Sequence, residues 1–265
     1  DYANANSFCC SVNPTVGRER FLRSIAPAQP GAPRNVVVIG GGPAGIQAAV
    51  TAAQRGHKVT LLEKAGRLGG KLLFSEQVPF KQDLRNFMNY LIHQAEKAGV
   101  DIRLNTAVTP EYVEEEQADA LILAVGSNPI VPPLPGIDGD NVIVVNDYYK
   151  NTEKVGDTVV VLGGGLAGCE CAVHLAQEGK TVHLVEMRDT LAPDCNIRHR
   201  PILMRQIDSL VNVHLSAAGK AVTPEGLLCA DADGNEVLVP GETIICAVGQ
   251  RANRADAEVL HTAAP

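Results

Sequence analysis

A segment that joins a buried strand, a glycine-rich turn and a helix occurs twice in this chain and restricts its fold more than any other feature. The first copy begins at Val36–Gly45, VVVIGGGPAG, where four apolar residues predict a buried parallel strand. The second copy begins at Thr158–Gly168, TVVVLGGGLAG, and is also followed by a helix-like stretch. Two such copies predict an α/β chain built from two Rossmann-like domains.

The glycines of the first copy have the spacing G-x-G-x-x-G, at Gly40, Gly42 and Gly45. The first glycine permits a tight turn, the second lets backbone approach a pyrophosphate, and the third lets helix and strand pack closely. The N–H groups at the start of the helix then face the phosphates. We therefore expect these glycines, with Pro43 and Ala44 between them, to bind a dinucleotide.

The second copy repeats this spacing at Gly163, Gly165 and Gly168. The same reasoning assigns a second dinucleotide to these glycines and to Leu166 and Ala167 between them. Two complete strand–glycine–helix–strand units in one chain are hard to obtain by chance.

Each copy ends in an acid at the expected place. Glu63 closes KVTLLE and Glu186 closes TVHLVE, each 23 residues after the first glycine of its motif. A carboxylate at this position accepts hydrogen bonds from a ribose 2′-hydroxyl, whereas an isolated acid would be read as a solvated charge. The Glu186 carboxylate would repel the 2′-phosphate of NADPH, so we favour NADH. Arg188 is the counter-argument, because its guanidinium could bind that phosphate.

Further positions are predicted from their place relative to the two motifs. A glycine pair follows Glu63 in GRLGGK and allows backbone near a nucleotide, although a plain loop is the alternative. Each copy also ends in the tripeptide AVG after an apolar strand. Together with Val108, the additional cofactor-binding positions expected are Lys64, Gly69, Gly70, Lys71, Ala124, Gly126, Ala247 and Gly249.

The repeated order of elements predicts an internal duplication of about 120 residues. Each copy is expected to contain the glycine-rich unit, a helix, a β-meander, an apolar strand and AVG. The first dinucleotide-binding domain would span residues 34–126 with a return segment, 249–265, and the second would span 127–248. Residues 1–33, rich in Pro and Ala in their second half, are expected to form a connector.

Composition excludes several classes of function. The net charge of -7 argues against a nucleic-acid surface, and no stretch has the ~20 apolar residues of a membrane span. The first residues, DYANANSF, lack the features of a signal peptide, and seven cysteines do not suggest a secreted disulfide framework. We therefore expect a cytoplasmic protein.

The sequence around the cysteines and histidines gives little indication of a metal site or a catalytic site. Cys195 and His199 are four residues apart with no second ligand pair, which is a weak case for zinc. Cys169 and Cys171 are expected to be packing residues of a helix. Cys10 and its neighbour Cys9 would be read, on local sequence, as reduced thiols. No G-x-S-x-G motif supports nucleophilic hydrolysis.

The chain resembles the flavoproteins with two dinucleotide-binding domains. GGGPAG with Glu63 matches their FAD unit, and GGGLAGCE with Glu186 matches their nested NAD(P)H unit. Residues 10–14, CSVNP, followed by GRE at 17–19, resemble the segment around the last iron–sulfur cysteine of the old-yellow-enzyme-like reductases. That family includes 2,4-dienoyl-CoA reductase, trimethylamine dehydrogenase and enoate reductases. GRLGGKLLFSEQVPFKQDL also resembles the family's stretch after the FAD acid.

The resemblance implies a relay in which hydride passes from NADH to FAD, then electrons pass through a [4Fe–4S] cluster to FMN and an activated C=C bond. It implies FAD on the first unit, NADH on the second, and Cys10 as a cluster ligand; Cys9 has no counterpart. The family's TIM barrel, with FMN and the small-molecule substrate, is absent from the sequence, so the chain is interpreted as truncated at both ends. No acid–base catalyst is expected, and the enzyme is expected to be a homo-oligomer.

Two alternatives remain at this point. One is the NAD(P)H electron-input module of a glutamate-synthase-like assembly, which has both dinucleotide units but places its cluster cysteines in a separate helical domain. The other is a non-catalytic interaction module with vestigial dinucleotide sites. The sequence does not name the final substrate.

Overall fold

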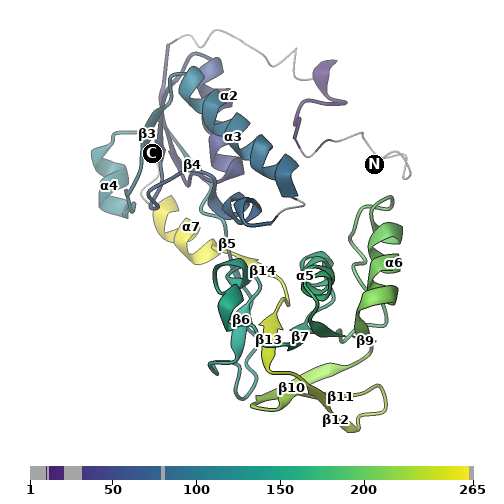
Figure 1. The fold of residues 1–265 in the computed structure, drawn as a ribbon. Coiled ribbons are helices and arrows are strands. Elements are labelled where there is room, and N and C mark those ends of the chain that lie inside the picture. The colour runs from purple at the N-terminus through teal and green to yellow at the C-terminus, as the bar shows by residue number, and fades with distance from the viewer. Residues whose placement is uncertain (1–9, 11, 21–31, 79–80, 263–265) are drawn as a thin grey trace. The chain divides into compact units, whose positions relative to one another are not determined.

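The computed structural model describes residues 10, 12–20, 32–78 and 81–262, and the chain divides into two compact units (Figure 1). The first unit comprises residues 1–127 and 252–265, and the second comprises residues 128–251. The sequence predicts these divisions at 126/127 and 248/249. The linking segments carry β5 (Ser127–Pro129) and β14 (Gln250–Ala252), which pair with each other.

The first unit is built on a four-stranded parallel sheet with the order β3-β2-β1-β4. Its strands are β1 (Asn35–Ile39), β2 (Lys58–Leu62), β3 (Asp101–Arg103) and β4 (Ala120–Leu123). The valines of β1 are buried on both sides, as their continuous apolar run predicts.

Helices cover both faces of this first sheet. One face packs against α2 (Pro43–Gln54) and α3 (Gln82–Lys97), with Val38, Ile46 and Leu91 in a shared apolar cluster. On the other face, α4 (Pro110–Glu115) and α7 (Arg254–His261) contribute to a second cluster. A 3₁₀ helix, η1 (Gly70–Glu76), follows the glycine pair.

The second unit has a five-stranded parallel sheet with the order β6-β13-β7-β8-β9. Its strands are β6 (Val142–Val144), β7 (Thr158–Leu162), β8 (Thr181–Val185), β9 (Asn212–His214) and β13 (Thr243–Cys246). Two short 3₁₀ helices, η3 (Tyr148–Lys150) and η4 (Thr152–Lys154), come before β7.

The two faces of the second sheet are covered differently. Helices α5 (Leu166–Gln177) and α6 (Arg200–Leu210) pack on one face, where Val159, Val161 and Leu184 share their core. The other face packs against an antiparallel meander formed by β10 (Ala218–Thr223), β11 (Gly226–Ala230) and β12 (Glu236–Pro240). Figure 1 shows these helices and the meander on opposite sides of the strands.

The two sheets confirm the predicted duplication and α/β class. In each unit the strand before the glycine-rich turn lies between the strand that ends in the acid and the strand that ends in AVG, so β3-β2-β1-β4 corresponds to β9-β8-β7-β13. The repeated plan was wrong in one respect, because a meander is present only in the second copy.

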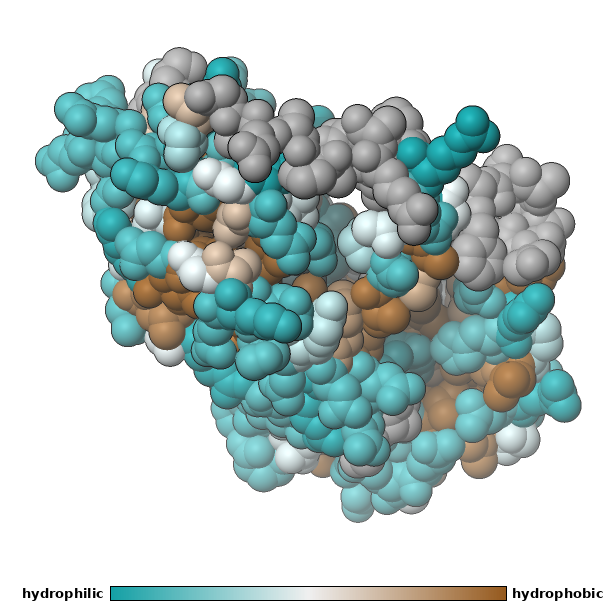
Figure 2. All heavy atoms as spheres, turned by 90° about the horizontal axis from the view of Figure 1, so that it is seen from above, coloured by the Kyte–Doolittle hydropathy of each residue, from teal (hydrophilic) through white to brown (hydrophobic). Residues whose placement is uncertain are grey.

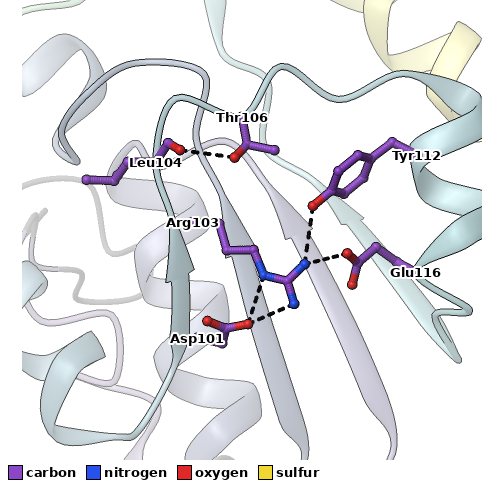
Figure 3. Close-up of polar contacts among 6 residues, drawn as sticks. All are labelled: Asp101, Arg103, Leu104, Thr106, Tyr112 and Glu116. Carbon is purple, nitrogen blue, oxygen red and sulfur yellow. Dashed lines mark hydrogen bonds and ion pairs between the residues drawn. The ribbon is translucent and has the colours of Figure 1, made fainter.

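In the first copy, α4 occupies the place of the expected meander. Pro110 occupies the first turn of this helix, and the Thr109 hydroxyl caps it by accepting a hydrogen bond from the Tyr112 N–H at 3.3 Å. Figure 3 shows how the helix is tied to β3: Arg103 donates to the Tyr112 hydroxyl at 3.2 Å and pairs with Glu116 and Asp101. The segment between β3 and β4 is too short for three strands, and these contacts fix it as a helix.

The surface in Figure 2 is mostly hydrophilic, with hydrophobic residues in separate patches. Among residues 10, 12–20, 32–78 and 81–262, no helix combines the length and apolar character needed to cross a bilayer.

Candidate dinucleotide-binding sites

The first and third glycines of the first motif are required by the fold itself. Gly40 has φ +108°, and a Cβ there would lie 2.3 Å from the Ala124 carbonyl oxygen at the end of β4. A Cβ on Gly45 would lie 1.8 Å from the Gly40 carbonyl oxygen. Only glycine therefore allows β1, its turn and α2 to pack this closely.

The second unit repeats this geometry. Gly163 has φ +111°, and its Cβ would lie 2.6 Å from the Ala247 carbonyl oxygen; a Cβ on Gly168 would lie 1.9 Å from the Gly163 carbonyl oxygen. The Ala124 N–H donates to the carbonyl of the last residue of β1, and the Ala247 N–H donates to the carbonyl of the last residue of β7, each at 2.8 Å. The predicted AVG alanines thus close the glycine turn in both units.

The second glycine of each motif is different, because the protein itself does not require it. A Cβ on Gly42 would be 4.0 Å from its nearest neighbour, Gly70 Cα, and a Cβ on Gly165 would meet nothing within 4 Å. Both residues have extended backbone that any residue can adopt, and each immediately precedes a helix. The N–H groups in the first turn of such a helix have no intrahelical acceptor. This open space beside free donors suits a pyrophosphate.

The two acids lie against the glycine turns. The Glu63 carboxylate accepts hydrogen bonds from the Gly41 N–H at 2.6 Å and the Ala65 N–H at 2.7 Å. In the second unit, Glu186 accepts from the Gly164 N–H at 2.7 Å and the Arg188 N–H at 2.9 Å. A carboxylate has about four acceptor sites, so each acid retains capacity for ribose hydroxyls.

Sequence reasoning missed the middle glycine of each turn. A Cβ on Gly41 would lie 2.4 Å from Leu68 Cδ2 and 3.0 Å from Glu63 Cβ. A Cβ on Gly164 would lie 2.4 Å from Leu191 Cδ2 and 2.9 Å from Glu186 Cβ. The triplet GGG was visible in both copies, but the G-x-G-x-x-G pattern leaves its middle position free.

The predicted residues after Glu63 lie in three settings. Gly69 donates to the Gly41 carbonyl at 2.8 Å, and a Cβ on Gly70 would lie 2.8 Å from Gly42 Cα, so the glycine pair packs directly on the turn. Lys64 and Lys71 are exposed. Val108 packs beside the apolar cluster of the first sheet, and its side chain is half-buried.

The segment after the second AVG contributes a residue that the sequence did not single out. The Asn253 side-chain amide donates to the Val125 carbonyl at 2.9 Å, and its N–H donates to the Gly126 carbonyl at 3.0 Å. Asn253 therefore holds the first AVG end in position. Because these partners are 128 residues apart, no local pattern could identify the contact.

A pocket of about 430 Å³ lies over the glycine turn of the second unit, within the size range of small-molecule sites. The predicted residues that line it are Gly163, Gly165, Glu186, Arg188, Ala247 and Gly249. Leu166, Ala167 and Gly168 are not part of its lining. Residues that sequence reasoning missed include Pro132, Leu134, Pro193, Asp194 and Ala217. These come from the proline-rich stretch PIVPPLP at residues 129–135, the turn after β8 and the start of the meander. Their approach to the glycine turn is set by the tertiary fold.

The cysteines and histidines were considered as metal ligands and as reactive groups. Cys169 and Cys171 are buried in the core around α5, as expected for packing residues, and burial raises the pKa of each thiol to about 12. Cys195 Sγ lies 3.6 Å from His199 Nδ1. Cys10 is exposed, and Cys9 lies outside the described residues. In the described part of the chain, no three His, Cys, Asp or Glu residues are grouped as metal ligands.

A comparison with models of known protein families shows to which family this chain belongs. A family model described as "Pyridine nucleotide-disulphide oxidoreductase" matches residues 34–264. The chain belongs to this family. Its members' class, NAD(P)H-dependent oxidoreductases, agrees with the class expected from the sequence.

Individual similar proteins show which members of the family this chain resembles. An NADH oxidase from Thermoanaerobacter brockii is 37% identical over 249 residues, which cover 91% of this chain and 38% of that protein. A cinnamate reductase from Clostridium sporogenes is 34% identical, covering 93% of this chain and 37% of that protein. A solved complex of 2-naphthoyl-CoA reductase has a TM-score of 0.86 and 30% identity, covering 95% and 38% of the two chains. The expected kinship with the enoate-reductase group is confirmed, and the chain spans less than half the length of these relatives.

Proposed function

We propose that this chain is the electron-input portion of a flavin and iron–sulfur oxidoreductase, in which the first unit binds FAD and the second binds NADH. The observation that carries this proposal is the pair of matching glycine turns, each with an open second glycine, a helix N-terminus and an acid. When bound, FAD accepts hydride from the nicotinamide at its N5 atom and can release electrons singly.

The residues of the first unit fit an FAD pyrophosphate and adenosine. Gly42 leaves room for a phosphate beside the start of α2, and the Gly69–Gly70 backbone packs against the same turn. Glu63 is held by the Gly41 N–H, so one of its oxygens is fixed beside the turn where a ribose would lie. This unit therefore binds and orients the cofactor, and none of its side chains needs to transfer a proton.

The second unit fits a nicotinamide dinucleotide in the same way. Glu186 and Gly165 both line the pocket over the turn. The negative charge of Glu186 disfavours a 2′-phosphate, which supports NADH over NADPH, although Arg188 also lines the pocket. Apolar residues such as Leu134 and Ala217 line part of the remaining wall.

We extend the proposal to the intact enzyme on the strength of the relatives' names. Cinnamate reductase and 2-naphthoyl-CoA reductase are named for substrates with conjugated C=C bonds. We propose that electrons continue from FAD through a [4Fe–4S] cluster that includes Cys10 to FMN in a TIM barrel, which reduces an activated C=C bond. We further propose that the enzyme is cytoplasmic and a homo-oligomer.

The open glycines give the sharpest test of the two cofactor sites. Gly165→Ala and Gly42→Ala introduce a Cβ that meets no protein atom closer than 4.0 Å, so both variants should fold with a thermal midpoint near that of the wild type. Gly165→Ala should weaken NADH binding at least tenfold and leave FAD content unchanged, because the Cβ occupies the space of a phosphate. Gly42→Ala should lower FAD content and leave NADH affinity unchanged. A wild-type protein that binds neither cofactor, or a Gly165→Ala variant with unchanged NADH affinity, would contradict the proposal.

Cys10 is tested separately in the full-length protein. Cys10→Ala should leave NADH-dependent bleaching of FAD intact and abolish reduction of the final substrate, while Cys195→Ala serves as the matched control and retains both activities. Unchanged turnover in Cys10→Ala would remove Cys10 from the electron path.

A further inference from the structure

The turn between β8 and α6 contacts the glycine-rich turn of the second unit. The Ala192 N–H donates to the Gly164 carbonyl at 2.8 Å. The Leu191 side chain is buried, and its Cδ2 lies only 2.4 Å from where a Cβ on Gly164 would be. Gly164 is the glycine that Glu186 holds through its N–H. The segment Thr190–Ala192, which we call the clamp turn, therefore holds the carbonyl side of the same residue, whose N–H side is held by Glu186.

Arg200, the first residue of α6, fastens the clamp turn. Its Nε and Nη2 both donate to the Leu191 carbonyl, at 3.1 and 2.8 Å, and Nη2 also donates to the Thr190 hydroxyl at 3.0 Å. A guanidinium presents its donors in a rigid planar fork, so these bonds define the orientation of the turn as well as its distance. Hydrogen bonds with a charged donor are also stronger than neutral ones.

The clamp turn contains a backbone conformation that needs such support. Ala192 has φ +42°, in the left-handed region that a residue with a Cβ rarely adopts. Unfavourable conformations of this kind persist where the surrounding structure holds them. The three Arg200 hydrogen bonds act on the two residues just before Ala192, so they supply that restraint.

The first unit provides an internal comparison. Leu68 and Gly69 follow Glu63 by five and six residues, as Leu191 and Ala192 follow Glu186. Gly69 also donates to the middle glycine's carbonyl at 2.8 Å, but it is a glycine and tolerates its φ of +121° without external support. The second unit has alanine at this position and adds the arginine.

We propose that Arg200 is a positioning residue for dinucleotide binding in the second unit: through Leu191 and Ala192 it holds Gly164, and with it the turn that receives the NADH pyrophosphate. The inference rests on the proposed NADH site. Arg200 acts through the clamp turn and need not touch the cofactor. Loss of the fork should let Ala192 relax toward negative φ, which withdraws its N–H from Gly164 and leaves the turn loosely held before NADH arrives.

The test measures the NADH dissociation constant in four variants at a temperature where all are folded. Arg200→Met should raise the dissociation constant about tenfold, the loss expected for charge-assisted hydrogen bonds. Arg200→Lys, which keeps the charge without the fork, should fall between Arg200→Met and wild type. Arg198→Met is the matched control, because Arg198 is exposed and its only described hydrogen bond uses the backbone N–H. FAD content should stay constant throughout.

The decisive variant is the double substitution Arg200→Met with Ala192→Gly. Glycine removes the cost of the left-handed conformation, so this variant should recover NADH affinity to within about threefold of wild type. Wild-type affinity in Arg200→Met, or no recovery on adding Ala192→Gly, would overturn the role of Arg200. Failure of the wild-type protein itself to bind NADH would instead overturn the proposed function.

Discussion

Glu186 accepts a hydrogen bond from the Gly164 N–H at 2.7 Å, so the acid expected to bind ribose also holds the turn expected to bind phosphate. The same relationship joins Glu63 to Gly41 at 2.6 Å in the first unit. One carboxylate therefore couples the ribose-binding and phosphate-binding parts of each candidate site, and its substitution should affect both.

Glu186→Gln should weaken NADH binding by about tenfold, because a neutral amide replaces charge-assisted hydrogen bonds to ribose. The amide oxygen can still accept from the Gly164 N–H, but the amide NH₂ then faces the Arg188 N–H, so one backbone hydrogen bond is lost and the thermal midpoint should fall slightly. NADPH should be affected less than NADH, since the charge that repels a 2′-phosphate is gone. Dissociation constants for both cofactors provide the measurement, and Asp189→Asn, an exposed acid three residues away, is the control. An unchanged ratio of NADH to NADPH affinity would argue against Glu186 at the ribose.

Gly168→Ala should destabilise the second unit by roughly 3 kcal/mol through overpacking. The new Cβ would lie 1.9 Å from the Gly163 carbonyl oxygen, which is backbone and cannot rotate away, so α5 and β7 must separate. Urea unfolding gives the free energy. Gly165→Ala, three residues earlier with no neighbour within 4 Å, should stay within about 0.5 kcal/mol of wild type. Equal stabilities for the two variants would refute the steric argument.

The sequence predicted the parts of the site that depend on local backbone geometry. Gly40, Gly45, Gly163 and Gly168 are required by contacts within one strand–turn–helix unit or with its neighbouring strand, and a fixed spacing reports such requirements. The two acids were also predictable, because the strand that carries each one runs parallel to the first strand with a matched register.

The parts that sequence reasoning missed depend on contacts between distant segments. No sequence motif around Arg200 indicates its role, because that role depends on its hydrogen bond to the Leu191 carbonyl and on the left-handed conformation of Ala192. The α4 helix was mistaken for part of a meander because only six residues carry its pattern and the analogy with the second copy outweighed its Thr109 cap.

Arg103→Met should lower the free energy of unfolding of the first unit by about 1 kcal/mol. The hydrogen bonds from Arg103 to Tyr112, Asp101 and Glu116 raise the pKa of the guanidinium above its ordinary value and tie β3 to α4 (Figure 3). Its side chain is 40% exposed, so solvent screens much of the attraction. Urea unfolding in low salt and in 1 M NaCl should show a smaller difference from wild type at high salt. Arg254→Met, an exposed arginine of the same unit, is the control, and a salt-independent difference would indicate lost packing instead.

His183 and His214 should make the second unit sensitive to acid. Their rings meet at 3.0 Å between Nδ1 and Nε2, and burial lowers the pKa of both, with the neighbouring charge of His214 adding to the effect on His183. Unfolded histidine titrates near ~6.5, above the folded values, so the unfolded state binds protons first as the pH falls. Stability should therefore be constant above that pH and decline below it.

Thermal midpoints between pH 5 and 8 test this dependence. The double variant His183→Gln/His214→Gln should show a shallower decline below pH 6.5 than the wild type, near the reference value for histidine. His261→Gln, an exposed histidine of α7, should keep the wild-type profile. Parallel profiles for the wild type and the double variant would exclude the pair as the source of acid sensitivity.

Burial should divide the cysteines into two reactivity classes. Burial raises the pKa of Cys169 and Cys171 to about 12 and that of Cys229 to about 11, and it also raises the pKa of Cys246. The thiolate is the reactive form, so iodoacetamide at pH 8 should label these four only after unfolding. Exposed Cys10 and half-buried Cys195 should react in the native protein, as peptide mass spectrometry would show.

Bound NADH should then slow the labelling of Cys195 but not of Cys10. Cys195 follows Asp194, which lines the pocket over the second glycine turn, so an occupied pocket restricts approach to the thiol and stiffens its loop. Cys10 lies outside that unit and serves as the internal control within the same digest. Equal protection of both thiols would indicate a global change on binding, and protection of neither would mean that NADH does not occupy this pocket.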